Sequence, residues 1–190
     1  MSNVIISNNI STNMGGGICL SYSSPTFINV SIVNNISTNK GGGVLHARSN
    51  PIYINTTISN NEALQGGGFY LEDIANPTIN NSILSYNSPE NVYFDANDSS
   101  GFTVEYSNIL GGEESIMLND VGMLYWLDGN IDVDPRFLDA ENDDYHLFAS
   151  SQLINAGHPD STDSDGSRAD MGAYPYLNNY SGPTWYIAES

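Results

Sequence analysis

Basic residues are scarce in this sequence. It contains 4 Lys and Arg residues against 22 Asp and Glu residues, which gives a formal net charge of −18 at pH 7. Nucleic acids and anionic membrane surfaces are bound mainly through Lys and Arg. The charge therefore excludes nucleic acid as a partner and leaves cations, neutral glycans and proteins. The acidic residues are unevenly distributed along the chain, since sixteen of them lie after residue 100.

Cysteine and long hydrophobic runs are also scarce. The single Cys19 excludes an internal disulfide framework. No run of eighteen apolar residues occurs, so we expect no membrane insertion. The opening MSNVIISNNI lacks the basic and apolar regions of a signal peptide. Because the first residues already lie within a repeat, we expect the chain to be a fragment whose signal peptide is not included.

A repeat of about 26 residues dominates the first half of the chain. The similar stretches ISNNISTNMGGG and IVNNISTNKGGG begin 26 positions apart, at residues 6 and 32. The glycine triplets 15–17, 41–43 and 66–68 keep this spacing to within one residue. Each period holds short β-prone runs separated by Asn, Ser, Gly and Pro, without apolar residues at helical spacing. A fixed period of this length indicates a solenoid.

The repeat predicts an all-β fold, a right-handed parallel β-helix of about 26 residues per coil with an irregular C-terminal capping segment. Equivalent side chains of successive coils would then stack about 4.8 Å apart. One column is expected to form an apolar ladder in the core: Ile6, Ile32, Ile58 and Leu84. Another is expected to form a hydrogen-bonded amide ladder at a turn: Asn29, Asn55 and Asn81.

The glycine triplets could hold a phosphate or form tight corners. A phosphate loop needs a following helix, with Lys and Ser or Thr directly after the glycines. Here a β-prone run follows each triplet, and Lys40 precedes its triplet. Because glycine accepts the positive φ of a tight corner, we interpret the triplets as corners of the coil.

The repeat also carries a family resemblance. The stretch PTFINVSIVNNISTNKGGGV is similar to the right-handed parallel β-helix repeats, of pectate-lyase-like fold, in bacterial secreted and cell-surface proteins. The likeness covers roughly residues 1–112. Residues 113–177 resemble the acidic C-terminal segment that often follows such helices. Residues 178–190, with GPTWYIAES, resemble a linker and the start of another β-helix module, which implies further modules of the same polypeptide as partners.

His46 and Arg48 are the only close basic pair within the repeats. The resemblance implies that lyases of this fold use an Arg or Lys base beside calcium-binding carboxylates in a groove. His46, however, stands where the neighbouring repeats have leucine, which predicts a core or rim residue. The nearby acids form an incomplete calcium cluster, and the aspartate pattern of polygalacturonases is absent. We therefore assign no catalytic residue.

The stretch DSTDSDGSRAD, residues 160–170, is the chemically most distinctive part of the chain. Four acidic residues lie in it around Gly166: Asp160, Asp163, Asp165 and Asp170. Calcium takes about six to eight oxygen ligands, which such carboxylates can supply, so calcium is a candidate cofactor. The terminal Glu of an EF-hand is missing. The alternative interpretation is a solvated acidic turn in which Arg168 pairs with a carboxylate.

Two functions fit these observations. The first is a secreted or surface-exposed structural or adhesive β-helix module without its own catalytic site, located outside a bacterial cell or on its surface. With twelve tyrosines and many amides it would bind carbohydrate or cell-surface components. The second is a polysaccharide lyase or glycoside hydrolase acting on an extracellular polysaccharide. The second function requires Arg48 to lie within a few ångströms of an acidic cluster.

A stabilising calcium ion at residues 160–170 would make the thermal midpoint depend on metal. We expect a chelator to lower the Tm and added calcium to restore it, because a ligand that binds only the folded chain stabilises that chain. Thermal melts with and without chelator check this. An unchanged midpoint would exclude a stabilising calcium site.

Overall fold

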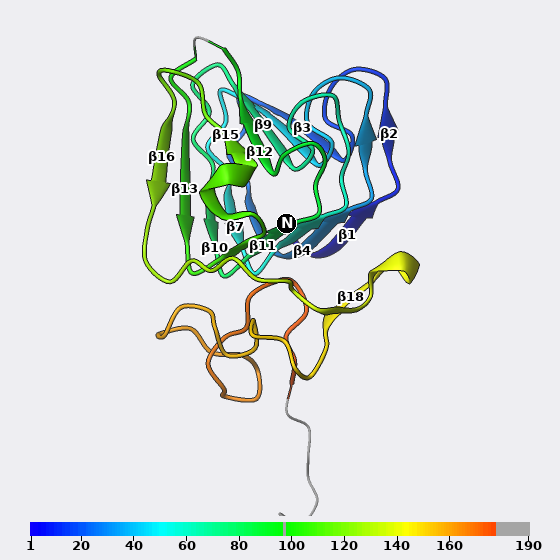
Figure 1. Ribbon diagram of the computed structural model, residues 1–190, viewed down its shortest axis with the longest axis vertical. Coiled ribbons are helices and arrows are strands. Elements are labelled where there is room, and N and C mark those ends of the chain that lie inside the picture. Colours follow the sequence, from blue (N-terminus) through cyan, green and yellow to red (C-terminus); the bar gives the residue numbers. More distant parts are fainter. Residues whose placement is uncertain (97, 178–190) are drawn as a thin grey trace, which may run out of the picture.

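The structure, a computed structural model, describes residues 1–96 and 98–177. Parallel strands of successive coils pair side by side and wind into a solenoid, as the repeat predicts (Figure 1). The expected start of another module, at residues 178–190, lies outside the described residues. One sheet takes a strand from each of 5 coils: β3 (Ile18–Ser21), β6 (Val44–Ala47), β9 (Phe69–Glu72), β12 (Val92–Phe94) and β15 (Ile116–Met117).

The largest sheet turns a corner of the solenoid within β4 (Thr26–Val33). Residues 26–28 pair with β7, whereas residues 31–33 pair with β8. Asn29 lies between the two halves with a φ of 54°, so a single left-handed residue makes the bend. The other strands of this sheet are β1 (Ser2–Ser7), β7 (Ile52–Ile54), β8 (Thr57–Ser59), β10 (Thr78–Asn80), β11 (Ile83–Ser85), β13 (Gly101–Glu105), β14 (Asn108–Ile109) and β16 (Met123–Trp126).

Apolar side chains of successive coils stack in columns inside the solenoid. One column follows the sequence pattern, since Ile6 pairs with Ile32, Ile32 with Ile58, and Ile58 with Leu84. Ile32, Ile58 and Leu84 are fully buried. Full burial of one such side chain contributes about 1.5–3 kcal/mol. These columns therefore supply a large part of the free energy that holds the coils together.

The glycine triplets form one corner of each coil. Their first members, Gly15, Gly41 and Gly66, have φ values of 58°, 64° and 68°, which glycine adopts without strain. A Cβ at the middle position, Gly42, would lie 2.5 Å from two backbone carbonyl oxygens. The Gly42 N–H donates to the Gly66 carbonyl at 3.0 Å. The amide is thus used by the next coil, and the triplet is a corner of the scaffold.

A hydrogen-bonded amide ladder is present in a different column from the expected one. It consists of Asn9, Asn35, Asn61 and Asn87, beside the short strands β2 (Ile10–Ser11) and β5 (Ile36–Ser37). Each Nδ2 donates to the Oδ1 of the next coil at 2.9–3.0 Å. The same Oδ1 atoms accept the preceding asparagine's backbone N–H at 3.0–3.1 Å. The ladder therefore joins successive coils through both side chains and backbone.

The column of Asn29, Asn55 and Asn81 does not form the expected chain of amide bonds. Asn29 donates to Asn3 at 3.2 Å, but the buried Oδ1 of Asn55 accepts no hydrogen bond. The Asn81 Oδ1 accepts the backbone N–H of His158 at 2.6 Å. The three asparagines have φ values of 54°, 48° and 48°. Asparagine tolerates this left-handed conformation better than most residues, which explains its recurrence at this corner.

Parallel pairing continues beyond residue 112. The 3₁₀ helix η1 (Gly112–Ser115) leads into β15, and β16 pairs in parallel with β13. Ile131 then forms a parallel bridge with Asn108. Gly111 and Gly112, at the start of η1, are therefore a turn within the solenoid, and the parallel pairing continues to about Ile131.

Residues 134–177 lie along the side of the solenoid, beneath β1, β4 and β11 in Figure 1. Contacts reach several coils: Asp143 accepts from Asn34 at 2.5 Å, and Asn60 donates to the Tyr145 hydroxyl at 3.0 Å. Outward-facing Ile83 packs with apolar residues of the segment. The segment holds an antiparallel pair and a 3₁₀ helix: β17 (Phe137–Asp139), β18 (Asp144–Leu147) and η2 (Ala140–Asn142). It covers a lateral face, whereas the expected cap would cover the last coil.

The buried amide ladder predicts a large cost for removing one of its members. Asn61→Ala deletes four side-chain hydrogen bonds and leaves buried partners unsatisfied, so we expect a loss of about 2–4 kcal/mol of unfolding free energy. Urea unfolding measures this loss. The matched control is Asn39→Ala, whose amide makes one 3.4 Å contact and should cost about 0.5 kcal/mol or less. Equal losses would contradict the role of the ladder.

Candidate functional site

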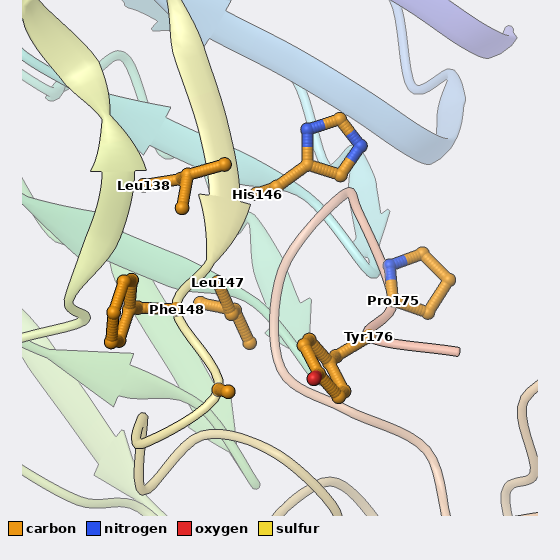
Figure 2. Close-up of a pocket in the computed structure, with 7 residues that line it drawn as sticks. Leu138, His146, Leu147, Phe148, Pro175 and Tyr176 are labelled. Carbon is orange, nitrogen blue, oxygen red and sulfur yellow. The ribbon is translucent and has the colours of Figure 1, made fainter. Parts of the chain in front are cut away.

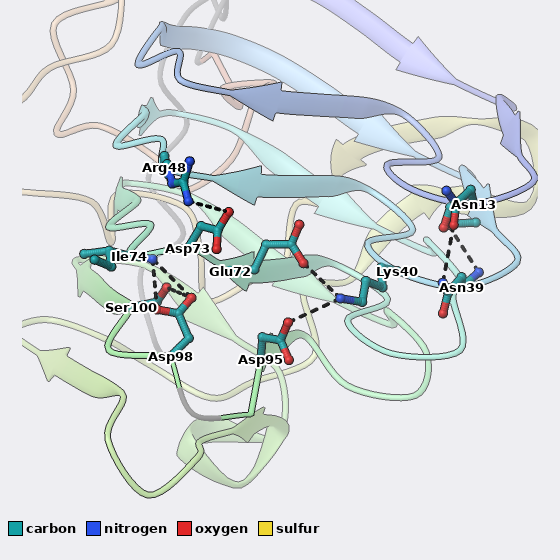
Figure 3. A network of polar contacts seen from close by, with 11 residues as sticks. Asn13, Asn39, Lys40, Arg48, Glu72, Asp73, Ile74, Asp95, Asp98 and Ser100 are labelled. Atoms are coloured by element: carbon teal, nitrogen blue, oxygen red, sulfur yellow. Dashed lines mark hydrogen bonds and ion pairs between the residues drawn. The ribbon is translucent and has the colours of Figure 1, made fainter.

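A network of charged side chains lies beside the five-stranded sheet (Figure 3), and two tyrosines of that sheet adjoin it. The Lys40 Nζ is 2.9 Å from Glu72 Oε2 and 3.3 Å from Asp95 Oδ2. It also lies 4.5 Å from the centroid of the Tyr70 ring. The Tyr70 ring stacks on that of Tyr93, with centroids 5.3 Å apart and planes at 13°. Pairing of β9 with β12 places these two rings in one column.

The network keeps Lys40 charged. Burial opposes the charge, but the contacts with Tyr70 and Glu72 outweigh it and raise the pKa of Lys40 above its ordinary value. Burial raises the pKa of Tyr70 to about 12, although Lys40 acts in the opposite direction. At neutral pH the pair is therefore an ammonium group above a neutral phenol. A permanently charged ammonium group cannot serve as a general base.

A polar cavity of about 240 Å³ lies beside this network. Arg48 contributes to its wall, 3.5 Å from Asp73 and 5.0 Å from the Tyr22 ring centroid. Asp95 lines it as well, so the cavity and the network share a carboxylate. Asp98 lines the cavity as well. Its carboxylate accepts a hydrogen bond from the Ser100 hydroxyl at 3.0 Å, and its two oxygens lie 2.9 and 3.1 Å from the backbone nitrogen of Ile74. Arg48 thus pairs with Asp73 and shares the cavity with Asp95 and Asp98, so the structure does not remove the alternative enzymatic function.

His46 lies in the core of β6, where its place in the leucine column predicts it. It pairs with Leu20 and Leu71 in the neighbouring coils and is fully buried. Its Nε2 is 2.8 Å from the Tyr53 hydroxyl, and its ring meets Phe69 edge-on with centroids 4.7 Å apart. Burial lowers the pKa of His46 to about 3. The imidazole is therefore neutral and has no access to the charged network.

Asp170, one of the four acids of the 160–170 stretch, is buried within the C-terminal segment. Its two carboxylate oxygens accept the backbone N–H groups of Asn155 and Tyr176, both at 2.6 Å. Burial raises its pKa above the ordinary value, although these two hydrogen bonds act in the opposite direction. Asp170 therefore joins the backbone at Asn155 to the backbone at Tyr176.

The other three acids of the stretch lie around the same turn. Asp163 accepts the backbone N–H of Asp170 at 3.0 Å, and Asp165 accepts the Ser167 hydroxyl at 2.6 Å. The Asp160 N–H donates to the imidazole of the preceding histidine at 3.2 Å. Over residues 1–96 and 98–177, no group of three or more His, Cys, Asp or Glu is arranged to hold a metal ion. A calcium ion at these carboxylates stays a prediction.

Sequence reasoning missed the aromatic part of the charged network. Tyr70 and Tyr93 are 23 positions apart in the chain, because this coil is shorter than the 26-residue period. Lys40 and Asp95 are separated by 55 residues. The available signal was the alternation of side chains along β9. Tyr70 and Glu72 lie on one side of this strand, and the other two residues of the strand face the core. That alternation, carried over to the next coil, would have placed Tyr93 beside Tyr70.

A family model described as a right handed beta helix region matches residues 1–137. Because this match covers more than half of the chain, the chain belongs to the right-handed β-helix family. No curated protein and no solved structure matches it. The fold supports a structural or polysaccharide-related module. In the described part of the chain, no helix is long and apolar enough to cross a membrane.

The buried His46 predicts a loss of stability in acid. Its folded pKa is about 3 and its ordinary value 6.5, so the stabilisation is present above pH 6.5 and is lost as the pH falls toward 3. At pH 4.5 this loss is about 2–3 kcal/mol relative to pH 7.5. The double variant His46→Leu/Tyr53→Phe copies the Leu20 and Phe27 of the first coil, so it lacks the titrating group.

Urea unfolding of both proteins at pH 7.5 and 4.5 tests this prediction. Other acidic groups titrate equally in the two proteins, so the difference between their pH dependences isolates His46. We expect the double variant to lose less stability than the wild type between the two pH values. The same loss in both proteins would show that His46 does not carry the acid sensitivity.

Proposed function

We propose that this chain is a secreted or surface-exposed structural or adhesive module of a bacterial protein, which binds neutral carbohydrate and has no catalytic site of its own. The partly exposed ring of Tyr93, which stacks on the buried ring of Tyr70 beside the polar cavity, carries the proposal. Tyr93 is half-buried and offers part of its surface to solvent. Sugar rings stack on such aromatic surfaces, and the carboxylates and the guanidinium group of the neighbouring cavity can accept hydrogen bonds from hydroxyl groups and donate hydrogen bonds to them.

The charges on this face favour a neutral glycan over a polyuronate. Lys40 is paired with Glu72 and Asp95, and Arg48 is paired with Asp73. Neither cation is free to bind a sugar carboxylate, and the surrounding acids would repel one. The excess of negative charge suits an extracellular protein that must stay soluble. Further modules of the same polypeptide would provide the attachment to the cell surface.

The alternative function is a polysaccharide lyase or glycoside hydrolase. It is favoured by one observation, the presence of Arg48 and three carboxylates around one cavity. A hydrolase needs one protonated and one ionised carboxyl group, whereas the ammonium group of Lys40 lies between Glu72 and Asp95. A lyase needs an unprotonated base, which neither paired cation offers. The binding module is therefore the better-supported proposal.

Retention on immobilised neutral polysaccharides tests the binding proposal. We expect binding by the wild type and a weakening of about three- to tenfold in Tyr93→Ala, because one aromatic contact is removed. Tyr125→Ala, which deletes an exposed tyrosine on β16, is the matched control and should bind like the wild type. Absence of binding above background, or equal binding by Tyr93→Ala, would contradict the proposal.

The same polysaccharides distinguish the alternative function. Incubation with the wild type should release no new reducing ends and no unsaturated products. Product release that is lost in Arg48→Ala would replace the binding proposal by an enzymatic one.

A further inference from the structure

An apolar pocket of about 410 Å³ opens in the C-terminal segment, outside the charged network (Figure 2). Leu138 of β17 and Leu147 of β18 form part of its wall, and Phe148 follows directly. Pro175 and Tyr176 come from the end of the described chain and close the opposite side. A cavity of this volume, lined mainly by apolar and aromatic groups, has the size of a small-molecule site.

The pocket is held in shape by bonds that reach the buried parts of the molecule. The Tyr176 N–H is bound by the buried Asp170 carboxylate at 2.6 Å. On the other side, the Tyr145 hydroxyl of β18 is fixed to the solenoid by Asn60 at 3.0 Å and by Asn34 at 3.3 Å. The Tyr174 ring lies against His146, with centroids 4.6 Å apart. Both walls are therefore positioned before any ligand arrives.

Several large apolar side chains around the pocket are exposed to solvent. Leu138 and Phe148 are each 53% exposed, and Tyr176 is 42% exposed. Three large side chains of this kind around one hollow form a patch that usually marks a binding site. Phe148 and Tyr176 both contribute aromatic rings to its lining, on either side of Leu147 in Figure 2.

The residues near the pocket carry both signs of charge, with acidic residues in excess. Arg136 accepts the Phe148 N–H with its carbonyl, and its guanidinium group donates to Ser150. Asp144 lies 2.7 Å from His146, which lines the pocket, and hydrogen bonds from His146 lower the pKa of Asp144 below its ordinary value. The turn between β17 and β18 contributes further acids: Asp139, Glu141 and Asp143. Among the described residues, neither Lys nor Arg lines the pocket. Aromatic faces and carboxylates both attract cations.

We propose that this pocket binds a small organic cation with an apolar body, of the trimethylammonium class. The apolar walls of Leu138 and Leu147 would take the methyl groups. The rings of Phe148 and Tyr176 would face the positive charge, and Asp144, which is paired with His146 of the pocket wall, would neutralise it. This site is separate from the proposed carbohydrate surface and does not depend on it.

Three soluble compounds with similar bulky heads and different charges test the proposal: choline, neutral 3,3-dimethylbutan-1-ol and anionic 3,3-dimethylbutanoate. Titration of the Phe148 and Tyr176 ring protons by NMR gives the affinity for each. We expect choline to bind about tenfold more tightly than the neutral alcohol, because cation–π and carboxylate attraction are lost in the alcohol. The anion should bind least. Equal affinities for choline and the alcohol, or no binding of choline, would overturn the proposal.

Variants connect the binding to this pocket. Phe148→Leu keeps an apolar side chain but removes a ring, and Asp144→Asn removes a charge, so each should weaken choline binding about three- to tenfold. Tyr125→Leu, an exposed tyrosine on β16 outside the pocket, is the matched control. If neither Phe148→Leu nor Asp144→Asn weakens choline binding, the proposal is overturned. Thermal melts identify any variant that fails to fold, and Tyr176→Leu then replaces it.

Vesicles of phosphatidylcholine distinguish the two sources of this headgroup. Co-sedimentation of the wild type, but not of Phe148→Leu, would identify a lipid headgroup as the ligand. Choline binding without co-sedimentation would identify a free or polymer-linked cation. Either result supports a cation site, whereas co-sedimentation that is identical in the variant and the wild type would place membrane contact elsewhere and overturn the assignment to this pocket.

Discussion

Parallel pairing between equivalent residues of successive coils is the constraint on which this structure depends. Because each strand pairs with its counterpart about 26 residues on, every side chain meets its own equivalent in the next coil. An apolar position becomes a core column, a glycine position becomes a corner, and an asparagine position becomes a ladder of amides. A column of buried polar groups can therefore satisfy itself through its stacked neighbours, which the ladder through Asn35 and Asn61 achieves.

The same pairing produces the two surfaces that carry the proposals, but in different ways. On the solenoid, outward positions of β9 and β12 place Tyr70 and Tyr93 in register, and the ion pairs of Lys40 hold the charged groups around them. The C-terminal segment has no such repeat. Its pocket depends on individual contacts with the side of the solenoid and on the buried Asp170. The first surface is flat and polar, and the second is concave and apolar.

Periodicity made the fold predictable from sequence, and its absence made the rest unpredictable. The column from Ile6 to Leu84, the glycine corners and the core position of His46 all follow from the repeat. Two asparagine columns share the same period, so the sequence could not reveal which one forms the amide ladder. Lys40 and Asp95 meet across two coils whose lengths differ, and the register between them cannot be counted from a fixed period. Residues 134–177 lie on the side of the solenoid because individual side chains fit its surface there, and no period in the sequence indicates this fit.

The amide ladder also gives the solenoid a direction. From Asn9 to Asn87 every bond between two ladder side chains runs one way, from the Nδ2 of one coil to the Oδ1 of the coil that follows. The Asn87 Nδ2 then donates to the nearby Asn91, whose Nδ2 ends the series by donating to the Leu110 carbonyl and the Ser115 hydroxyl. A coil in the middle of the series thus accepts a side-chain hydrogen bond from the asparagine before it and donates one to the asparagine after it, while its Nδ2 also donates to a backbone carbonyl of the preceding coil. Duplicating one such coil would provide every new donor with an acceptor. The rod can therefore be lengthened in evolution by whole-coil duplication, whereas adding part of a coil would break the series.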